Sequence, residues 1–377
     1  MSLNEFNGDR QVRVSSSTTS SNVTVQQIAE RLGVSLATVS LALNHPDARV
    51  AAATRSKVLR TALEMGYHRS TLARAIKIPL RHVGVVLGDT EAQQPLANQV
   101  LGGILAAASA ENYLPLIQPS PRGADQTIHD EALKRIVDLY ASKLVDGFIL
   151  DKRYFLNASI LRMHSHGVPV VTVNGHTVRT PNGKALPSVM VDTREGGRLA
   201  TAHLLELGHR RVGLISPPYS SLSTDQLPWW VTMMIVGYRK ALRRAGVPMD
   251  PRLLAEGDPE NKHRTYAAIT RLMNDPNPPT ALLVGDDRMA VMAIHALALM
   301  GLRVPGDVSV VGFGDLPVAR NLSLPELTSV HVPLRESGQE ALRMLVAQLD
   351  HEDLPSSRLV LQPRLVIRQS TQPKRLS

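Results

Sequence analysis

Residues 24–44 read TVQQIAERLGVSLATVSLALN, and this stretch predicts two short helices joined by a tight turn. Thr24 is placed to cap the first helix, and Gly33 is placed to end it. Ser35 is placed to cap the second helix. The apolar residues that recur at helical spacing are Val25, Ile28, Ala29, Leu32, Val39, Ala42 and Leu43. Two short helices around a glycine-containing turn form a helix-turn-helix.

A third helix is predicted over residues 54–66, TRSKVLRTALEMG. Its inward face is expected to carry Val58, Leu59, Ala62, Leu63 and Met65. Three helices of this kind also occur as an ordinary helical cap. The pattern alone therefore leaves open whether the module binds nucleic acid.

Basic residues are concentrated in this part of the chain. Residues 1–81 carry 11 Lys and Arg against 5 Asp and Glu, whereas the whole chain carries 42 against 33. Such an excess suits phosphate binding, and a solvated basic surface is the alternative. Residues 34–44 themselves hold no charged residue. Basic residues elsewhere in the module include Arg31, Arg49, Arg55, Arg69, Arg74 and Lys77.

Length and composition limit what the rest of the chain does. A length of 377 residues predicts two or three domains, and the absence of cysteine excludes disulfides, thiol nucleophiles and cysteine-based zinc sites. Residues 1–22, rich in Ser, Thr and Asn, predict a disordered tail without the apolar segment of a secretory signal. No uncharged apolar run reaches the roughly 18 residues of a membrane span. A soluble, cytoplasmic protein is expected.

Beyond Val83, short runs rich in Val, Ile and Leu alternate with helical patterns. The predicted strands are 82–88, 113–118, 145–150, 168–174, 188–192, 211–216, 280–286 and 308–314. The predicted helices are 98–111, 125–142, 193–207, 231–245, 262–274, 287–300 and 335–349. This alternation indicates parallel sheets covered on both faces, and the number of units predicts two Rossmann-like lobes. Ligands of such sheets bind at the C-terminal ends of the strands, which two facing lobes would place around one cleft.

Longer motifs stand in a characteristic order along the chain. They are VTVQQIAERLGVSLATVSLALN, TRSKVLRTALEMGY, LARAIK, VDGFIL, PVVTVN, VDTREGGRLATAHLLELGHRRVGLIS, GYRKALRRAGV, PPTALLVGDDRMAVMAIHALALMGLRVPGDVSVVGFGD and LTSVHVP. In these motifs residues 23–370 resemble the LacI family of bacterial transcriptional repressors. The resemblance implies a multidomain protein with an all-α helix-turn-helix DNA-binding domain and an α/β periplasmic-binding-protein-like sensor of two Rossmann-like lobes.

The resemblance also implies domain boundaries and partners. It predicts a disordered tail (1–22), a helix-turn-helix domain (23–68), a hinge helix with linker (69–81), a two-lobed effector-binding and dimerisation domain (82–370) and a short tail (371–377). Lobe one would combine about 83–191 with 334–361, and lobe two about 192–331 with 362–370. The expected partners are double-stranded operator DNA of pseudo-palindromic sequence, a second copy of the chain, and a small-molecule effector between the lobes. The dimer contact is expected along both lobes, with helices such as 98–111.

In the family, the second helix lies in the DNA major groove. The residues that match DNA-contacting positions are Thr24, Ser35, Leu36, Ala37, Thr38, Ser40, Leu41, Asn44, Arg49 and Thr54. Many members carry Arg or another polar side chain where this chain has Leu41, and an arginine there pairs with guanine. Leu36, Ala37 and Leu41 contact only apolar groups such as thymine methyls. We therefore expect a half-site read through thymine methyls and DNA shape, with phosphate contacts that position the module.

STLARAIK (70–77) resembles the family's hinge helix, which enters the minor groove and wedges an apolar side chain between base steps. Ile76 matches the wedge, flanked by Arg74 and Lys77. An exposed amphipathic linker is the alternative.

The sensor cleft departs from the family pattern. Relatives commonly hold their ligand with Asp, Arg, Asn, a second Asp and Gln, and the matching positions here are Asn174, Met234, Asp286, Gly314 and Val332. Because most of these positions have lost their polar group, an ordinary sugar effector is not expected, and loss of the arginine argues against a carboxylate or phosphate. The remaining predicted effector-site residues are Gly88, Trp229 and Trp230, the tryptophans as a stacking wall. The expected ligand is less polar than a sugar, or cationic and facing Asp286, and a cleft without an effector is the alternative.

Two further acidic residues adjoin the cleft positions. Asp287 precedes a predicted helix and is expected to be its N-cap, and Asp315 is expected to hold a loop. His164 and His166 lack a third metal ligand nearby, and the chain has no P-loop or G-x-S-x-G motif. We therefore predict no enzyme, no catalytic residues, no metal and no cofactor. The functions left open are a solute-binding receptor without a DNA function, an effector-independent DNA binder and a sugar-processing enzyme.

Overall fold

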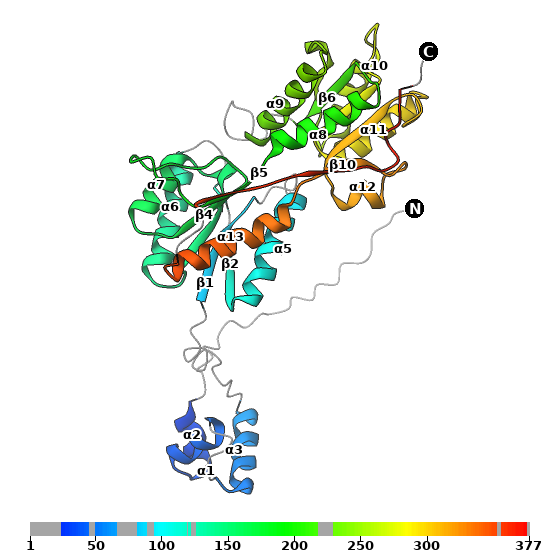
Figure 1. Ribbon diagram of the computed structural model, residues 1–377. Helices are drawn as coiled ribbons and strands as arrows, with labels where there is room; N and C mark the ends of the chain where they lie inside the picture. The colour runs from blue at the N-terminus through cyan, green and yellow to red at the C-terminus, as the bar shows by residue number, and fades with distance from the viewer. Residues whose placement is uncertain are drawn as a thin grey trace, which may run out of the picture. The chain divides into compact units, whose positions relative to one another are not determined.

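The computed structural model describes residues 24–44, 50–65, 81–88, 94–118, 120–121, 126–217, 229–352 and 356–374. The chain divides into two compact units, Met1–Pro79 and Leu80–Ser377 (Figure 1). The predicted tail at 1–22 and the predicted hinge helix at 70–77 lie outside the described residues. Within the described part, no helix is both long enough and apolar enough to pass through a membrane.

The first unit contains three helices that begin and end where the sequence places caps. They are α1 (Val25–Leu32), α2 (Leu36–Asn44) and α3 (Ala52–Glu64). Thr24 Oγ1 accepts a hydrogen bond from the Gln27 N–H, and Gln27 Oε1 accepts one from the Thr24 N–H, which completes a capping box. Gly33 has a φ of 62°, a left-handed conformation that residues with a Cβ rarely adopt. Ser35 Oγ accepts from the Thr38 N–H at 3.0 Å, so all three predicted caps are confirmed.

A small apolar core joins the three helices. Its buried residues are Ile28, Ala29, Val39, Ala42, Leu43, Val58 and Ala62. Arg55 Nη1 donates to the Ala42 carbonyl oxygen at 3.1 Å and ties α3 to α2. Leu59 is 49% exposed, so its predicted inward position was wrong. It lies about 100° around the helix from the buried Val58.

The second unit holds two lobes of the same design. The strands of lobe one are β1 (Arg81–Val86), β2 (Tyr113–Gln118), β3 (Gly147–Asp151), β4 (Val170–Val173), β5 (Ser188–Val191) and β11 (Arg358–Leu361). They form a parallel sheet in the order β11-β5-β4-β3-β1-β2. The helices packed with this sheet are α5 (Gln94–Ala110), α6 (Gln126–Ala141), the 3-10 helix η1 (Lys152–Tyr154), α7 (Asn157–Ser165) and α13 (Leu334–Leu349).

Lobe two repeats this strand order. Its strands are β6 (Val212–Ser216), β7 (Leu254–Glu256), β8 (Ala281–Val284), β9 (Ser309–Gly314), β10 (Thr328–His331) and β12 (Arg364–Val366), in the order β12-β10-β9-β8-β6-β7. β12 runs antiparallel to β10, and the other pairs are parallel. The helices are α8 (Thr193–Glu206), α9 (Trp229–Arg244), the 3-10 helix η2 (Pro251–Leu253), α10 (Lys262–Met273), α11 (Asp287–Leu299) and α12 (Pro317–Asn321).

The predicted strands and helices of this unit all form, with ends shifted by a few residues. The elements that the sequence did not predict are α7, β7, α12, β10, β11 and β12. Most of them are only a few residues long, which leaves little periodicity to detect.

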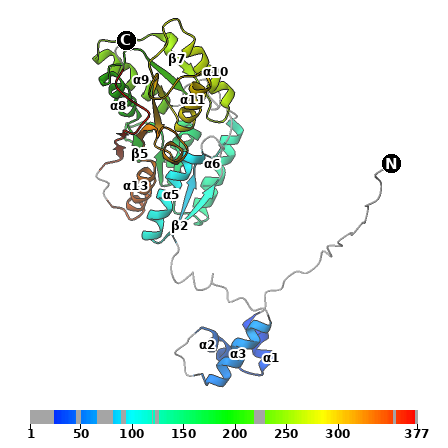
Figure 2. The same cartoon turned by 90° about the vertical axis from the view of Figure 1, so that its right-hand side faces the viewer.

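The chain passes between the lobes before α8, before α13 and between β11 and β12. Glycines set how closely α8 and α13 pack against their neighbouring helices. α13 lies along α5 in lobe one, and α8 lies along α9 in lobe two (Figure 1, Figure 2). A Cβ on Gly103 would lie 1.9 Å from the Arg335 carbonyl oxygen, and one on Gly237 would lie 1.9 Å from the Arg194 carbonyl oxygen. The backbones of the two helices are therefore in direct contact where α5 crosses α13 and where α9 crosses α8.

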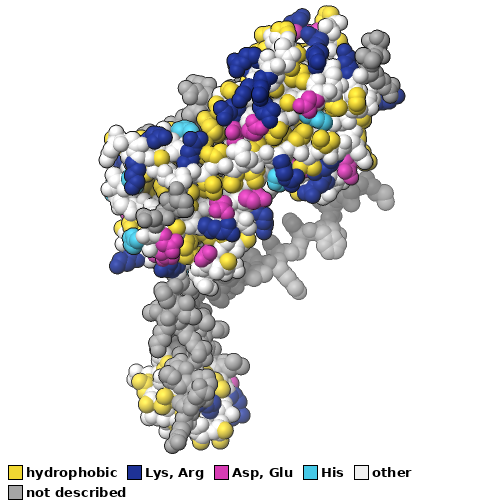
Figure 3. All heavy atoms as spheres, viewed as in Figure 1, with side chains coloured by type: hydrophobic (Ala, Val, Ile, Leu, Met, Phe, Trp, Pro, Cys, Tyr) yellow, Lys and Arg dark blue, Asp and Glu magenta, His cyan; other side chains and the backbone are white. Residues whose placement is uncertain are grey.

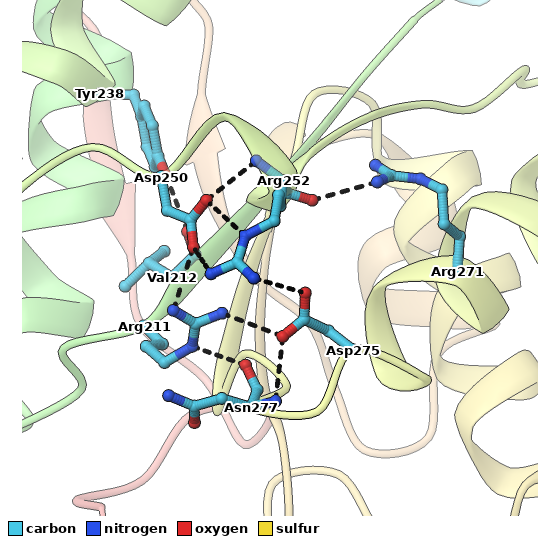
Figure 4. Close-up of polar contacts among 8 residues, drawn as sticks. All are labelled: Arg211, Val212, Tyr238, Asp250, Arg252, Arg271, Asp275 and Asn277. Carbon is cyan, nitrogen blue, oxygen red and sulfur yellow. Dashed lines mark hydrogen bonds and ion pairs between the residues drawn. The ribbon is translucent and has the colours of Figure 1, made fainter.

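An ion-pair network closes the N-terminal edge of the lobe-two sheet (Figure 4). Arg211 donates to Asp250 Oδ2 at 3.1 Å, to Asp275 Oδ1 at 3.4 Å and to the Asn277 carbonyl oxygen at 2.6 Å. Arg252 donates to both carboxylate oxygens of Asp250, and the hydrogen bonds from Arg252 and Arg211 hold the pKa of the Asp250 carboxyl well below its ordinary value. The network joins the loops that precede β6, β7 and β8.

Candidate functional sites

A cavity lies between the lobes, at the C-terminal ends of strands in both sheets. It holds about 660 Å³ of empty space, counting its open mouth. Its lining residues are Leu96, Arg153, Asn174, Gly175, Val191, Thr193, Trp229, Trp230, Gly285, Asp286, Phe313, Gly314, Val332 and Leu334. The position is that of a ligand site in a parallel α/β sheet.

The lobe-one wall carries an arginine held by a buried aspartate. Asp151 ends β3 and caps η1, accepting from the Arg153 N–H at 3.1 Å. Its carboxylate also accepts from Arg153 Nε at 2.9 Å and Nη2 at 2.5 Å, and from Asn174 Nδ2 at 3.0 Å. Burial alone would lower the pKa of Arg153, but the charge and hydrogen bonds of Asp151 outweigh it and raise that pKa. Asn174 has a φ of 59°, an uncommon conformation that brings its amide to Asp151.

The lobe-two wall has an equivalent aspartate–arginine pair, but there the aspartate lines the cavity instead of the arginine. Asp286 follows β8 and caps α11, accepting from the Arg288 N–H at 2.8 Å. The Arg288 guanidinium donates to both oxygens of Asp286, at 3.0 and 2.8 Å. Asp286 lines the cavity, whereas Arg288 is not among the lining residues. The carboxylate expected to face a cationic ligand is therefore already neutralised.

Asp287 is not the N-cap of α11, and that prediction was wrong. Asp286 is the cap, and Asp287 is the first helical residue, buried beneath the cavity wall. Its carboxylate accepts from Ser329 Oγ and from the Leu316 N–H, both at 2.6 Å. Burial raises the pKa of Asp287 to about 7, against the effect of these two hydrogen bonds. Its role is nevertheless structural, because it ties α11 to the β9–α12 turn.

Asp315 holds a loop, as expected. Its carboxylate accepts from Arg368 Nη2 at 2.5 Å and contacts His331 Nδ1 at 3.2 Å. His209, which follows α8, contacts the Thr280 hydroxyl at 2.9 Å and the Ser309 hydroxyl at 3.1 Å. Both residues stabilise lobe two and lie outside the cavity lining.

The remaining lining is mostly apolar, but it includes one buried hydroxyl group without a hydrogen-bond partner in the described residues. Trp230 and Phe313 stack with ring centroids 6.4 Å apart and an interplanar angle of 30°. Thr193, the first residue of α8, is 6% exposed, and its Oγ1 has no hydrogen-bond partner in the described part of the chain. An unpaired buried hydroxyl lowers stability, so such groups often mark ligand positions.

The structure brings together most of the predicted effector-site residues. Asn174, Trp229, Trp230, Asp286, Gly314 and Val332 line the cavity. Gly88 and Met234 do not: Gly88 lies against the hydroxyl end of Tyr154, and Met234 is fully buried, with its Cε beside Gly285 and its backbone against Gly197. The replacement of a polar residue by Met234 therefore fills space behind the wall.

Arg153, Thr193 and Phe313 were missed by the sequence analysis. A detectable signal was present for Arg153, because the charged triplet Asp151, Lys152 and Arg153 follows a predicted strand directly. Lys152 does not line the cavity. Its Nζ donates to the Phe155 carbonyl oxygen at 2.8 Å.

The second helix of the first unit has one buried face and one exposed apolar face. Val39, Ala42 and Leu43 are buried, whereas Leu36 is 55% exposed and Leu41 is 42% exposed. The exposed side of this helix therefore presents apolar side chains without any charged group. The Ser35 and Thr38 hydroxyls bond each other at 2.8 Å at the start of this helix.

The other predicted DNA-contacting residues divide by where they lie. Thr24 and Ala37 are exposed, and Ser40 and Thr54 are half-buried. Asn44 ends α2, but its side chain lies outside the described residues, as do Arg49, Arg74, Ile76 and Lys77.

Comparison with known families matches both units. Residues 24–70 match the family described as bacterial regulatory proteins, lacI family. Residues 201–371 match a periplasmic binding protein-like domain.

Curated relatives match over nearly the full chain. The HTH-type transcriptional repressor CytR of Escherichia coli (strain K12) is 31% identical over 350 residues, covering 92% of this chain and 96% of the relative. Catabolite control protein A of Priestia megaterium is 29% identical over 358 residues, covering 93% and 99%.

Solved structures show the same arrangement of elements. The Lac repressor dimer bound to operator and the anti-inducer ONPF has a TM-score of 0.68 and 25% identity, covering 93% of this chain and 99% of that chain. The transcriptional regulator CelR in complex with cellobiose has a TM-score of 0.64 and 29% identity, covering 92% and 99%.

Proposed function

The chain belongs to the LacI family of bacterial regulatory proteins, and we propose that it is a repressor whose operator binding responds to a small molecule in the inter-lobe cavity. One observation carries this function. The same chain holds a helix-turn-helix with exposed apolar side chains on its second helix and a two-lobed sensor with a cavity between the lobes. Its named relatives are regulators, and we propose that this chain likewise acts in the cytoplasm without catalysing a reaction.

We assign DNA contact to residues of two segments. In the helix-turn-helix they are Thr24, Ser35, Leu36, Ala37, Thr38, Ser40, Leu41, Asn44, Arg49 and Thr54, and in the hinge they are Arg74, Ile76 and Lys77. Hydroxyl groups at the start of α2 suit phosphate contacts that fix position. The exposed leucines suit thymine methyl groups, which gives sequence preference without an arginine.

The proposed domain division follows from these assignments. Residues 23–68 form the DNA-binding domain, 69–81 the hinge and 82–370 the sensor. Lobe one takes β1–β5, α13 and β11, and lobe two takes α8, β6–β10 and β12. The chain passes between the lobes three times. A change in the angle between the lobes would therefore move both sheets together.

We further propose that the chain acts as a homodimer. Leu105 on α5 is 47% exposed, and Leu114 and Ile117 on the edge strand β2 are 46% and 61% exposed. α5 and β2 pack against each other, so all three exposed side chains lie at the same edge of lobe one, where we place the dimer contact. A two-fold dimer reads two half-sites of a pseudo-palindromic operator.

The test is to map where the protein binds its own genome by crosslinking and sequencing. We expect a few sharp sites that share a palindrome. Leu41→Arg adds a guanine-pairing side chain to α2, so its occupied sites should gain a guanine in each half-site. Leu59→Arg adds the same charge to the exposed surface of α3 and should keep the original palindrome.

Diffuse occupancy without a palindrome would contradict a sequence-specific repressor. An unchanged motif for Leu41→Arg would contradict the assignment of the reading face while leaving the repressor function intact.

A further inference from the structure

The charged groups around the cavity are already paired with one another. On lobe one, Arg153 is held by Asp151 through Nε and Nη2, and on lobe two, Asp286 is held by Arg288. An anionic ligand placed beside Arg153 would also face Asp151, and a cationic ligand beside Asp286 would also face Arg288. Either ligand would have to compete with a bidentate pair that is largely buried, which costs binding free energy. The cavity therefore favours an uncharged ligand.

Hydrogen-bonding capacity remains at two lining residues, Thr193 and Arg153. The Thr193 hydroxyl is buried and without a partner in the described residues. Arg153 also lines the cavity, and the pair with Asp151 leaves its Nη1 as the remaining terminal nitrogen. A ligand with a hydrogen-bond acceptor on one edge would satisfy these groups.

The aromatic part of the lining suits a flat apolar body. Trp229, Trp230 and Phe313 all line the cavity, and the last two are stacked. Leu96, Val191, Val332 and Leu334 add aliphatic surface and no further polar group. Aromatic side chains bind a ring through its face, whereas a polyhydroxylated ligand would leave its hydroxyls unpaired on such a surface.

We propose that the effector of this repressor is an uncharged, ring-bearing molecule that lies against Trp230 and Phe313 and presents a hydrogen-bond acceptor to Arg153 and Thr193. The regulatory role of this ligand rests on the proposed function. Its binding in the cavity does not, because binding is measurable without DNA.

The chain offers a direct reporter of binding. Its only two tryptophans are Trp229 and Trp230, and both line the cavity. Tryptophan fluorescence of the full-length protein is titrated with matched probes that differ in charge, benzamide against benzoate and nicotinamide against nicotinate, and with glucose as an uncharged polyhydroxylated probe. We expect the uncharged aromatic compounds to change the fluorescence and the anions and glucose to leave it unchanged. Tighter binding of the anions or of glucose, or no response to any ring compound, would overturn the proposal.

Two threonines of α8 provide a matched pair of variants. Thr193→Val keeps the shape and removes the unpaired hydroxyl, so it should weaken the neutral probe about 3- to 10-fold while leaving the unliganded protein equally or more stable. Thr201→Val removes a buried hydroxyl that donates to the Gly197 carbonyl oxygen at 2.8 Å, so it should leave the probe affinity unchanged. Unchanged affinity in Thr193→Val would contradict a contact between that hydroxyl and the ligand.

Asp151→Asn tests whether charge pairing sets the preference. It leaves the Arg153 charge without its counterion, so the ratio of benzoate to benzamide affinity should rise at least about tenfold. An unchanged ratio in the folded variant would overturn the charge argument. Should this variant not fold, the wild-type comparison of benzamide with benzoate decides the same point.

Failure of this inference is separable from failure of the proposed function. A protein that binds its palindrome but responds to none of the uncharged rings contradicts the ligand class alone. A protein whose tryptophans respond to benzamide but which occupies no specific DNA site contradicts the repressor function alone.

Discussion

The two lobes carry the same ion pair at the cavity, but they turn opposite partners toward it. β3 and β8 hold the same place in their sheets, and each is followed by an aspartate that caps a helix and binds the arginine two residues on. In lobe one the arginine, Arg153, lines the cavity, and in lobe two the aspartate, Asp286, does so. The repeated fold therefore places one positive group, Arg153, and one negative group, Asp286, on the cavity wall. Each of them is already paired with an oppositely charged side chain.

The largest expected effect comes from breaking the more buried pair. Asp151→Asn leaves Arg153 charged, and its side chain is only 8% exposed, so the free energy of unfolding should fall by about 3–5 kcal/mol. Asp286→Asn should cost less, because Arg288 is 19% exposed and lies near the charges of Glu260 and Asp258. Denaturant unfolding followed by circular dichroism measures both. Equal losses would contradict the difference in burial between the lobes.

A second comparison concerns the helix crossings. Gly103→Ala would place a Cβ 1.9 Å from the Arg335 carbonyl oxygen, so we expect a loss of about 1–3 kcal/mol although alanine normally favours helices. Gly102→Ala is the matched control, since its Cβ would meet only the end of the Arg335 side chain at 3.1 Å. Gly237→Ala should repeat the loss in lobe two, where the contact is again 1.9 Å. Stability gains at Gly103 or Gly237 would show that the crossings are looser than described.

A third comparison concerns the residue that lies in sequence between the aspartate and the arginine of each pair. It is Lys152 in lobe one and Asp287 in lobe two, and burial raises the pKa of Asp287 to about 7 from an ordinary value of 3.8. The folded protein therefore retains a proton that the unfolded chain has lost, and the resulting stability is present below about pH 4 and lost as the pH rises through about 7. Thermal melts should show a steeper fall over this range for the wild type than for Asp287→Asn. Parallel curves would contradict a protonated Asp287.

The smallest effects are expected at the solvent-facing edges of the sheets. Arg211 reaches two aspartates and a carbonyl in lobe two and is 23% exposed, so Arg211→Ala should lower the melting temperature by about 2–4 °C (Figure 4). In lobe one, Arg81 pairs with Asp350 and is 47% exposed, so Arg81→Ala should lower it by less than about 2 °C. A larger loss at Arg81 would reverse the ranking. On the face shown in Figure 3, basic and acidic side chains are interspersed over the sensor, so single exposed charges should matter little.

Much of the fold was predictable because it depends on local pattern. The caps at Thr24, Gly33 and Ser35 and the long α/β units follow from residue type and spacing alone. The short strands β10, β11 and β12 were not predictable, since their pairing depends on segments distant in the sequence.

The cavity was predictable in place but not in chemistry. Strand ends located Asn174, Asp286 and Gly314 correctly on its wall. The sequence could not show that Asp286 is paired with Arg288, that Met234 is buried behind the wall or that Arg153 enters the lining. These facts depend on how side chains meet across the fold, which spacing does not encode.

One measurement tests the central claim, that the paired walls form a ligand site which controls DNA binding. Full-length protein is bound to a labelled fragment carrying its mapped palindrome, and an uncharged ring ligand is added while tryptophan fluorescence and DNA anisotropy are recorded together. We predict that both signals change over the same range of ligand concentration, and that Thr193→Val shifts both to higher concentration by the same factor, because coupling between two sites is reciprocal. A tryptophan signal that saturates while the DNA anisotropy stays constant would show that the cavity binds ligand without controlling the operator, and would contradict the account.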